Sequence, residues 1–188
     1  MSARAMKHTS PGSTRAGAWI RSTATLVSLA AATTLSASAS PQPPVGALPV
    51  ALALEAATET LRVCEARGLR VAVAVVDPDG VIKVQARGDG SPIHSQDFSW
   101  RKAYTVMSMG PMQGVDTSGA LVGKVAAAAT EGTSKLLMLP GAVLVKQNGQ
   151  AIGAIGVSGA PRSLDDESCA QAGAEKIRAS LQASATGQ

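Results

Sequence analysis

The stretch 143-VLVKQNGQAIGAIGVS-158 gives the clearest indication of the fold, because two apolar runs flank a single turn signal. Asn148-Gly149 lies between residues 143–146 and residues 150–158. An Asn-Gly pair in that setting favours the type I′ turn of a β-hairpin. We therefore predict a hairpin over residues 143–158.

Glycines recur in the second half of this stretch, at Gly153, Gly156 and Gly159. Their spacing does not match a phosphate-binding loop. They alternate with apolar residues such as Ile152 and Ile155, and glycine in a strand usually permits the close approach of another backbone. We interpret them as packing positions.

A second hairpin is predicted upstream. Residues 70–77 form a β-branched run, Pro78-Asp79-Gly80 supplies a turn, and residues 81–87 form the second strand. Helices are predicted at 48–67, 95–109, 116–129 and 163–181. The order helix, hairpin, helices, hairpin, helix predicts an α+β fold, with an antiparallel sheet built from two hairpins and helices packed on it.

Glycine, proline and capping residues set the expected helix boundaries. Gly68 follows the first helix as a C-terminal stop, and Gly110-Pro111 is expected to end the second. Asp116 is the expected N-cap of the third helix, and Ser163 that of the fourth.

The net charge of +4 is concentrated at the start of the chain. Residues 1–44 carry Arg4, Lys7, Arg15 and Arg21 and no carboxylate. The remaining residues therefore carry equal numbers of basic and acidic side chains. A neutral domain lacks the positive surface that nucleic-acid binding needs, so nucleic acid is not expected as a partner.

Residues 1–44 have the composition of a signal peptide followed by a Pro-rich start of the mature chain. The uncharged run from Ser22 to Ser40 follows the basic stretch, and Ala37-Ser38-Ala39 is a small-residue cleavage pattern. We expect cleavage after Ala39 and a mature domain of residues 45–188, exported to the periplasm or the extracellular space, with no membrane span after removal of the signal. An organelle transit peptide or a disordered tail is the alternative.

Cys64 and Cys169 are the only cysteines, and neither belongs to a metal-binding or haem-attachment motif. Each falls on an expected helix. A bridge between cysteines so far apart in sequence requires a specific Cα separation. We therefore expect two small buried thiols, with a disulfide in an oxidising compartment as the alternative.

Recognisable catalytic motifs are missing from the sequence. It contains no GxSxG, no HExxH and no Walker loop, and its two histidines are His8 in the leader and His94. No catalytic residue is therefore assigned.

Four segments together carry a resemblance to a known family: 71-VAVAVVDPDG-80, 87-RGDGSPIHSQDFSWRKAYTVMSMG-110, 139-LPGAVLVKQNGQAIGAIGVSGAP-161 and 165-DDESCAQAGAEKI-177. In this order they resemble the HbpS/GlcG family of haem-binding proteins over residues 50–180. The resemblance implies a profilin-like domain that assembles into homo-oligomers and is often exported. It further implies binding of haem b or a related tetrapyrrole in several members, and haem degradation in some.

On this resemblance His94, just before a helix, is the candidate axial ligand of a haem iron. Without the resemblance, a lone histidine is interpreted as a surface residue or a hydrogen-bonded residue. Arg101 or Lys102 is expected to meet a propionate, although Arg101 is equally placed for an ion pair with Asp97.

Further along this helix, Tyr104 and Thr105 carry hydroxyl oxygens. Three roles are open for them: a weak iron ligand, a hydrogen-bonding group or a residue that only packs. Trp100, Met107 and Met109 are expected in the core or an oligomer interface.

Three functional hypotheses remain open at this point. The first is an exported haem- or tetrapyrrole-binding protein without turnover. The second is an enzyme that degrades haem oxidatively. The third is an oligomeric scaffold or sensor partner with no ligand.

Overall fold

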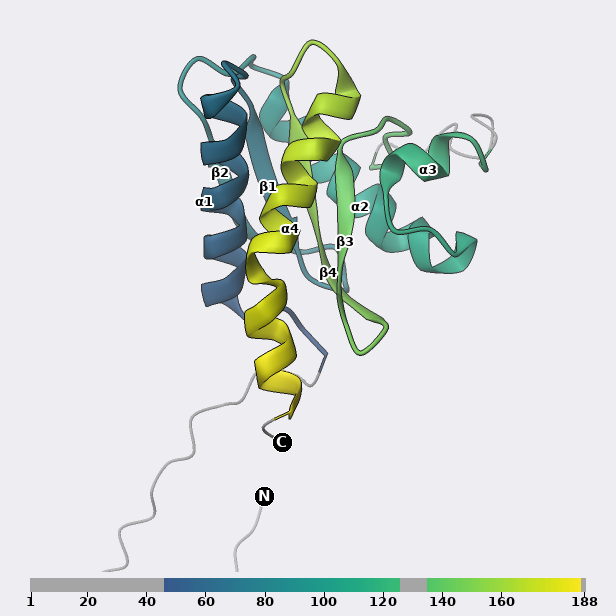
Figure 1. The fold of residues 1–188 in the computed structure, drawn as a ribbon. Helices are drawn as coiled ribbons and strands as arrows, with labels where there is room; N and C mark the ends of the chain where they lie inside the picture. Colours follow the sequence, from purple (N-terminus) through teal and green to yellow (C-terminus); the bar gives the residue numbers. More distant parts are fainter. Residues whose placement is uncertain (1–45, 126–134, 187–188) are drawn as a thin grey trace, which may run out of the picture. The chain divides into compact units, whose positions relative to one another are not determined.

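Two hairpins lie side by side in one antiparallel sheet in the computed structural model, which describes residues 46–125 and 135–186 (Figure 1). The strands are β1 (Ala72–Val76), β2 (Ile82–Arg87), β3 (Ala142–Gln147) and β4 (Gln150–Ser158). Their order in the sheet is β2-β1-β4-β3. Asn148 and Gly149 have φ angles of 51° and 81°, as a type I′ turn requires. Both predicted hairpins and the α+β fold class are confirmed.

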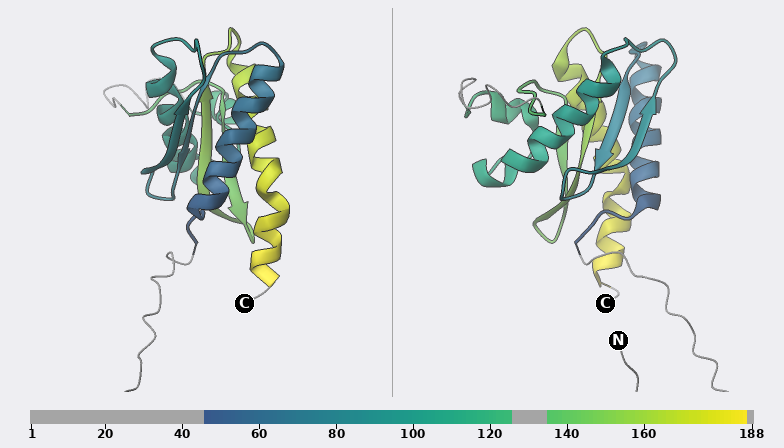
Figure 2. Two further views of the ribbon diagram at one scale, coloured as in Figure 1. Left: turned by 90° about the vertical axis from the view of Figure 1, so that its left-hand side faces the viewer. Right: turned by 180° about the vertical axis from the view of Figure 1, so that it is seen from behind.

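Helices cover both faces of the sheet (Figure 2). The helices α1 (Val50–Ala66) and α4 (Ser163–Thr186) pack on one face, and α2 (Ser95–Gln113) packs on the other. Because side chains alternate along a strand, Val73 and Val75 of β1 join the cluster under α1 and α4. Val76 joins the cluster under α2. The sheet is therefore buried on both sides.

The glycines of β4 are packing positions, as predicted. A Cβ at Gly156 would collide with the backbone of α2, at the carbonyl oxygen of Ser99 and, 2.7 Å away, at the amide nitrogen of Ala103. Glycine at this position lets α2 lie directly on the sheet. The position of α2, and with it the placement of its outward side chains, therefore depends on Gly156.

Two helix predictions need correction. The helix α2 continues through Pro111 and ends at Gln113, with Gly114 as its C-cap at a φ of 63°. Pro111 has no amide to donate to Met107, and the helix continues for only two residues beyond it. The helix α3 (Ser118–Val122) is capped by Thr117 instead of Asp116, and it ends at Val122, well before the predicted limit.

Residues 126–129 of that predicted third helix lie outside the described residues, as does the predicted signal peptide. In the parts of the chain that the structure describes, no helix combines the length and hydropathy needed to cross a bilayer.

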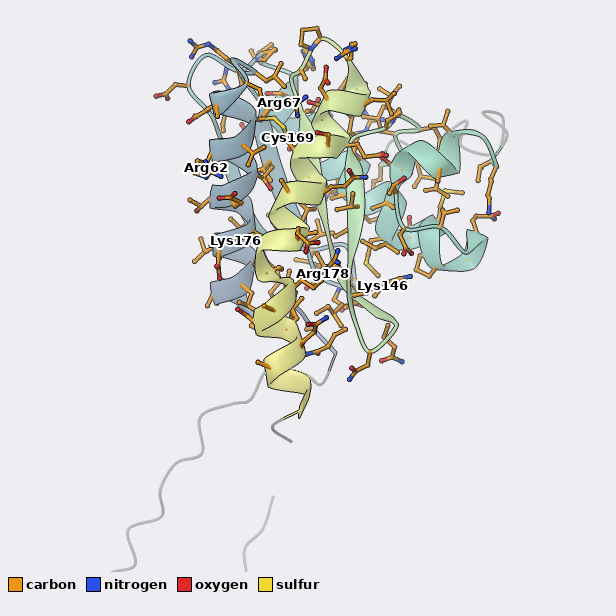
Figure 3. The ribbon with its side chains drawn as sticks, in the orientation of Figure 1. Arg62, Arg67, Lys146, Cys169, Lys176 and Arg178 are labelled. Atoms are coloured by element: carbon orange, nitrogen blue, oxygen red, sulfur yellow. A yellow bond between two sulfur atoms is a disulfide. The ribbon has the colours of Figure 1, made fainter. Side chains whose placement is uncertain are left out.

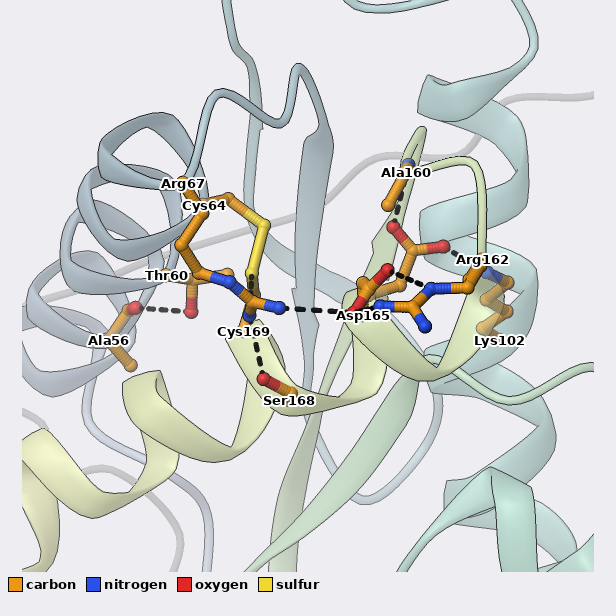
Figure 4. The surroundings of a disulfide bond; sticks show 11 residues. Ala56, Thr60, Cys64, Arg67, Lys102, Ala160, Arg162, Asp165, Ser168 and Cys169 are labelled. Atoms are coloured by element: carbon orange, nitrogen blue, oxygen red, sulfur yellow. Dashed lines mark hydrogen bonds and ion pairs between the residues drawn. A yellow bond between two sulfur atoms is a disulfide. The ribbon is translucent and has the colours of Figure 1, made fainter.

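Cys64 on α1 and Cys169 on α4 form a disulfide, with their Cα atoms 5.7 Å apart (Figure 4). The expectation of two separate thiols was wrong. The physical reason is tertiary packing, because α4 approaches α1 so closely that a Cβ at Gly173 would collide with Thr60. The distance between two helices that are remote in sequence cannot be predicted from local pattern.

Arg67 lies over this disulfide (Figure 4). Its Nη1 donates to the Ser168 hydroxyl at 2.8 Å and lies 3.7 Å from Cys169 Sγ. Its Nη2 donates to the Asp165 carboxylate at 3.1 Å. Both cysteines are fully buried, so the bridge is shielded from solvent.

Candidate functional site

The helix α2 presents a continuous row of side chains away from the sheet. Residues spaced by three and four lie on one side of a helix. The buried residues of α2, Ser99, Ala103 and Val106 among them, face the sheet. The opposite side, which we call the outer face of α2, consists of His94, Asp97, Phe98, Arg101 and Tyr104.

Aromatic rings are concentrated on this helix. The chain has one Phe, one Tyr and two Trp, and Trp19 lies outside the described residues. The other three, Phe98, Trp100 and Tyr104, are all on α2, and each is only partly buried. The buried members of both core clusters are aliphatic residues, Met and Cys. Large aromatic side chains normally contribute to a core, so their placement together at the surface favours a binding role.

His94 precedes the first turn of α2 and is exposed. Its side chain makes no capping hydrogen bond, and its ring centroid lies 5.0 Å from that of Phe98. Among the described residues, no group of three His, Cys, Asp or Glu side chains is arranged to hold a metal ion. His94 thus offers a single exposed imidazole at the start of α2.

Arg101 lies at the centre of the outer face. Its Nη2 donates to the Leu136 carbonyl at 2.9 Å, and its Nη1 lies 3.5 Å from Asp97. The alternative ion pair with Asp97 is thus present. The guanidinium carbon also lies 5.7 Å from the Phe98 ring centroid. Arg101 is therefore partly engaged within the protein.

Lys102 does not reach the outer face. Its ammonium donates to Asp166 at 2.8 Å, and both side chains are 2% exposed. Burial raises the pKa of Asp166, against the lowering effect of Lys102. A ligand carboxylate would have to displace Asp166 to reach this lysine.

Thr105 is buried and ties α2 to a neighbouring segment. Its hydroxyl donates to the Arg101 carbonyl at 2.7 Å and accepts from the Leu137 amide at 2.8 Å. Both bonds are internal, so this oxygen packs within the protein.

The ring of Tyr104 is tilted by 55° against that of Trp100, with ring centroids 5.8 Å apart, and Trp100 donates to the Gly80 carbonyl at 3.3 Å. On the other side, the Lys135 ammonium lies 5.7 Å from the Tyr104 ring centroid. Sequence reasoning missed Lys135. No local pattern places it there, because it reaches α2 only through the hydrogen bonds of Leu136 and Leu137.

The predicted packing residues divide between two environments. Met107 is buried in the cluster under α2, and Trp100 and Met109 pack against that cluster from its edge. Met107 is therefore a core residue, whereas Trp100 extends the aromatic surface of α2.

Three cavities lie elsewhere in the domain. Two of them, of about 410 and 550 Å³, share Asp116, Leu144 and Arg178 and lie between β3 and α4. The third, of about 630 Å³, includes Asp77 and Gln150 near the hairpin turns. The outer face of α2 lines none of these three.

Comparisons with known proteins bear on the family and the fold of this chain. The family model described as haem degrading protein HbpS-like matches residues 48–175. A double mutant of HbpS from Streptomyces reticuli is 34% identical, with a TM-score of 0.64, and the match covers 77% of this chain and 97% of that one.

Two more distant structures share the fold. The protein ORFY from Klebsiella pneumoniae is 22% identical over 75% of this chain and 97% of its own, with a TM-score of 0.65. A complex of PduOC with haem is 20% identical over 70% of this chain and 96% of its own, with a TM-score of 0.61. No curated protein sequence matches the chain.

Proposed function

The chain belongs to the HbpS-like family, and on this premise we propose that it is an exported protein that binds haem b or a related tetrapyrrole on the outer face of α2. The description of the matched family and the haem complex of a protein with the same fold support haem as the ligand.

The observation that carries the proposal is the grouping of Phe98, Trp100 and Tyr104 on one helix, outside an otherwise aliphatic core. A porphyrin is a large flat π system, and aromatic side chains bind such surfaces by offset stacking or edge contacts. Phe98 and Tyr104 are six residues apart, about one and two-thirds helical turns, which places them about 9 Å apart along the axis. That separation matches a ligand of porphyrin size.

His94 is the proposed axial ligand, since its exposed imidazole lies at one end of the ring surface. A haem iron takes a nitrogen ligand from histidine or an oxygen ligand from tyrosine. Tyr104 is therefore the alternative ligand. Its ring already contacts Trp100 and Lys135, which favours a stacking role for Tyr104 and leaves coordination to His94.

The disulfide supports export. Bridges such as Cys64–Cys169 persist in oxidising compartments and are rare in reducing ones. Together with the composition of residues 1–44, this favours a periplasmic or extracellular location. Sequencing the N-terminus of the mature protein tests the proposal, with a start at Ser40 expected and an intact Met1 as the contrary result.

Oxidative haem degradation is the second candidate, because the description of the matched family names that activity. Such turnover requires peroxide, or dioxygen with a reductant, as the co-reactant. The test compares the loss of haem absorbance with and without protein at equal peroxide. Formation of one defined tetrapyrrole product only in the presence of protein would establish turnover, whereas equal bleaching would exclude it.

The binding proposal is tested by titrating residues 45–188 with haemin. We expect Phe98→Leu and Tyr104→Leu each to weaken binding about three- to tenfold, through loss of ring contact. Leu54→Ala, which changes an exposed side chain of α1, is the control and should bind like the wild type. Equal affinity in all four proteins would contradict the assignment of the outer face.

A further inference from the structure

The segment that carries Lys135 is held against α2 at two points. Arg101 Nη2 donates to the Leu136 carbonyl at 2.9 Å, and the Leu137 amide donates to Thr105 Oγ1 at 2.8 Å. These bonds fix the backbone directly after Lys135. As a result the Lys135 ammonium lies 5.7 Å from the Tyr104 ring centroid, at the border of the outer face.

Lys135 differs from the other cations near this surface in its charge environment. Lys102 is buried against Asp166, and Arg101 shares its charge with Asp97. Lys135 is exposed, and no carboxylate of the described residues lies within ion-pair distance of it. Among the described residues, it is therefore the cation at this face that is most available to an external anion.

The basic residues on the opposite side of the sheet illustrate the contrast (Figure 3). Arg62 pairs with Glu59, and Arg178 pairs with Glu175. Lys176 lies 3.8 Å from Glu55. Those charges are balanced internally, so they give no reason to expect an anionic ligand there.

We propose that Lys135 binds a carboxylate of the ligand and that the site therefore selects tetrapyrroles with free carboxylate side chains over their neutral esters. This inference rests on the proposed haem-binding function and deepens it. It assigns the carboxylate contact mainly to Lys135, in place of Lys102, whose charge is already neutralised in the interior. A flat ligand stacked on Phe98 and Tyr104 directs its carboxylate chains to the edge of the ring surface, where an ammonium with three donors meets them.

The test compares haemin with haemin dimethyl ester, in one detergent-containing buffer, on wild type and variants. Wild type should bind haemin about fivefold more tightly than the ester, as expected for one exposed charge pair. In Lys135→Gln this preference should disappear through weaker haemin binding, with ester binding unchanged. Lys135→Arg should retain most of the preference, because it keeps the charge.

Lys146→Gln is the matched control, since it removes the same charge from an exposed lysine on β3, one that pairs with Asp116. It should keep the wild-type preference, and circular dichroism should show all variants folded. A preference that survives in Lys135→Gln, or is absent from wild type, overturns the assignment of Lys135 while haem binding itself stands. If wild type binds neither compound, the proposed function fails as well.

Discussion

Lys102 on α2 and Asp166 on α4 form a buried ion pair between helices that lie on opposite faces of the sheet. Its Nζ and Oδ2 atoms are 2.8 Å apart, and both side chains are 2% exposed. The other Asp166 oxygen accepts from the Ala160 amide at 2.9 Å. The neighbouring Glu167 accepts from the amides of Gly119 and Gly141. This polar cluster connects helices from opposite faces of the sheet, so it stabilises the position of α2.

Replacing Lys102 by Met should strongly destabilise the protein. The substitution removes the cation and leaves the Asp166 carboxylate buried without its partner. Breaking a buried pair in this way costs about 3–5 kcal/mol. Urea unfolding followed by circular dichroism measures the change, and a loss within error of zero would show that the pair is not maintained in solution.

The destabilisation by Lys102→Met should depend on pH. Burial raises the pKa of Asp166, and Lys102 lowers it. Removal of Lys102 should therefore raise the pKa of Asp166 further. A carboxyl whose pKa is higher in the folded than in the unfolded protein contributes stability below the unfolded pKa, and that stability is lost as pH rises through the folded pKa. The variant should therefore be less destabilised at about pH 5 than at about pH 8, relative to wild type at each pH. An equal difference at both pH values would contradict this account.

The disulfide should contribute substantially to stability, because it closes a loop with a sequence separation of 105. Cys64→Ser combined with Cys169→Ser is expected to lower the free energy of unfolding by about 3–5 kcal/mol. Wild type in reducing agent, once the bridge is opened, should approach the double variant. Identical unfolding midpoints for oxidised wild type and the double variant would indicate that the bridge does not form.

Gly156→Ala tests the close contact of α2 with β4. The added methyl group meets the backbone of Ser99 and Ala103, and overpacking of this kind costs about 1–3 kcal/mol. We expect a lower unfolding midpoint and weaker haemin binding, because α2 must shift. Gly149→Ala, at the open hairpin turn where nothing lies within 4 Å, should lower stability through its positive φ and leave haemin binding unchanged.

Local sequence patterns predicted both hairpins and the fold class, because Asn148-Gly149 and Pro78-Asp79-Gly80 specify turns between β-branched runs. They also identified Gly156 as a packing position. The same reasoning failed at Pro111, where a proline near a helix end is tolerated, and at the cysteines, whose pairing depends on the distance between α1 and α4.

The candidate site was predicted only in part. The four-residue spacing of Asp97 and Arg101 predicted their ion pair as the alternative to a propionate contact, and the structure has that pair. It did not reveal that Lys102, one residue further, turns into the interior to meet Asp166. Nor did it reveal Lys135, because long-range hydrogen bonds bring that residue to the site.

The most direct test of the account is a haemin titration of wild type and His94→Ala, followed by absorption in the Soret region, with Tyr104→Phe in parallel. Binding on the outer face of α2 with His94 on the iron predicts a shifted Soret band that saturates in wild type and persists in Tyr104→Phe. In His94→Ala that band should be weakened or moved to another position. A wild-type spectrum that remains that of free haemin, or a His94→Ala spectrum identical to wild type, would contradict the central claim.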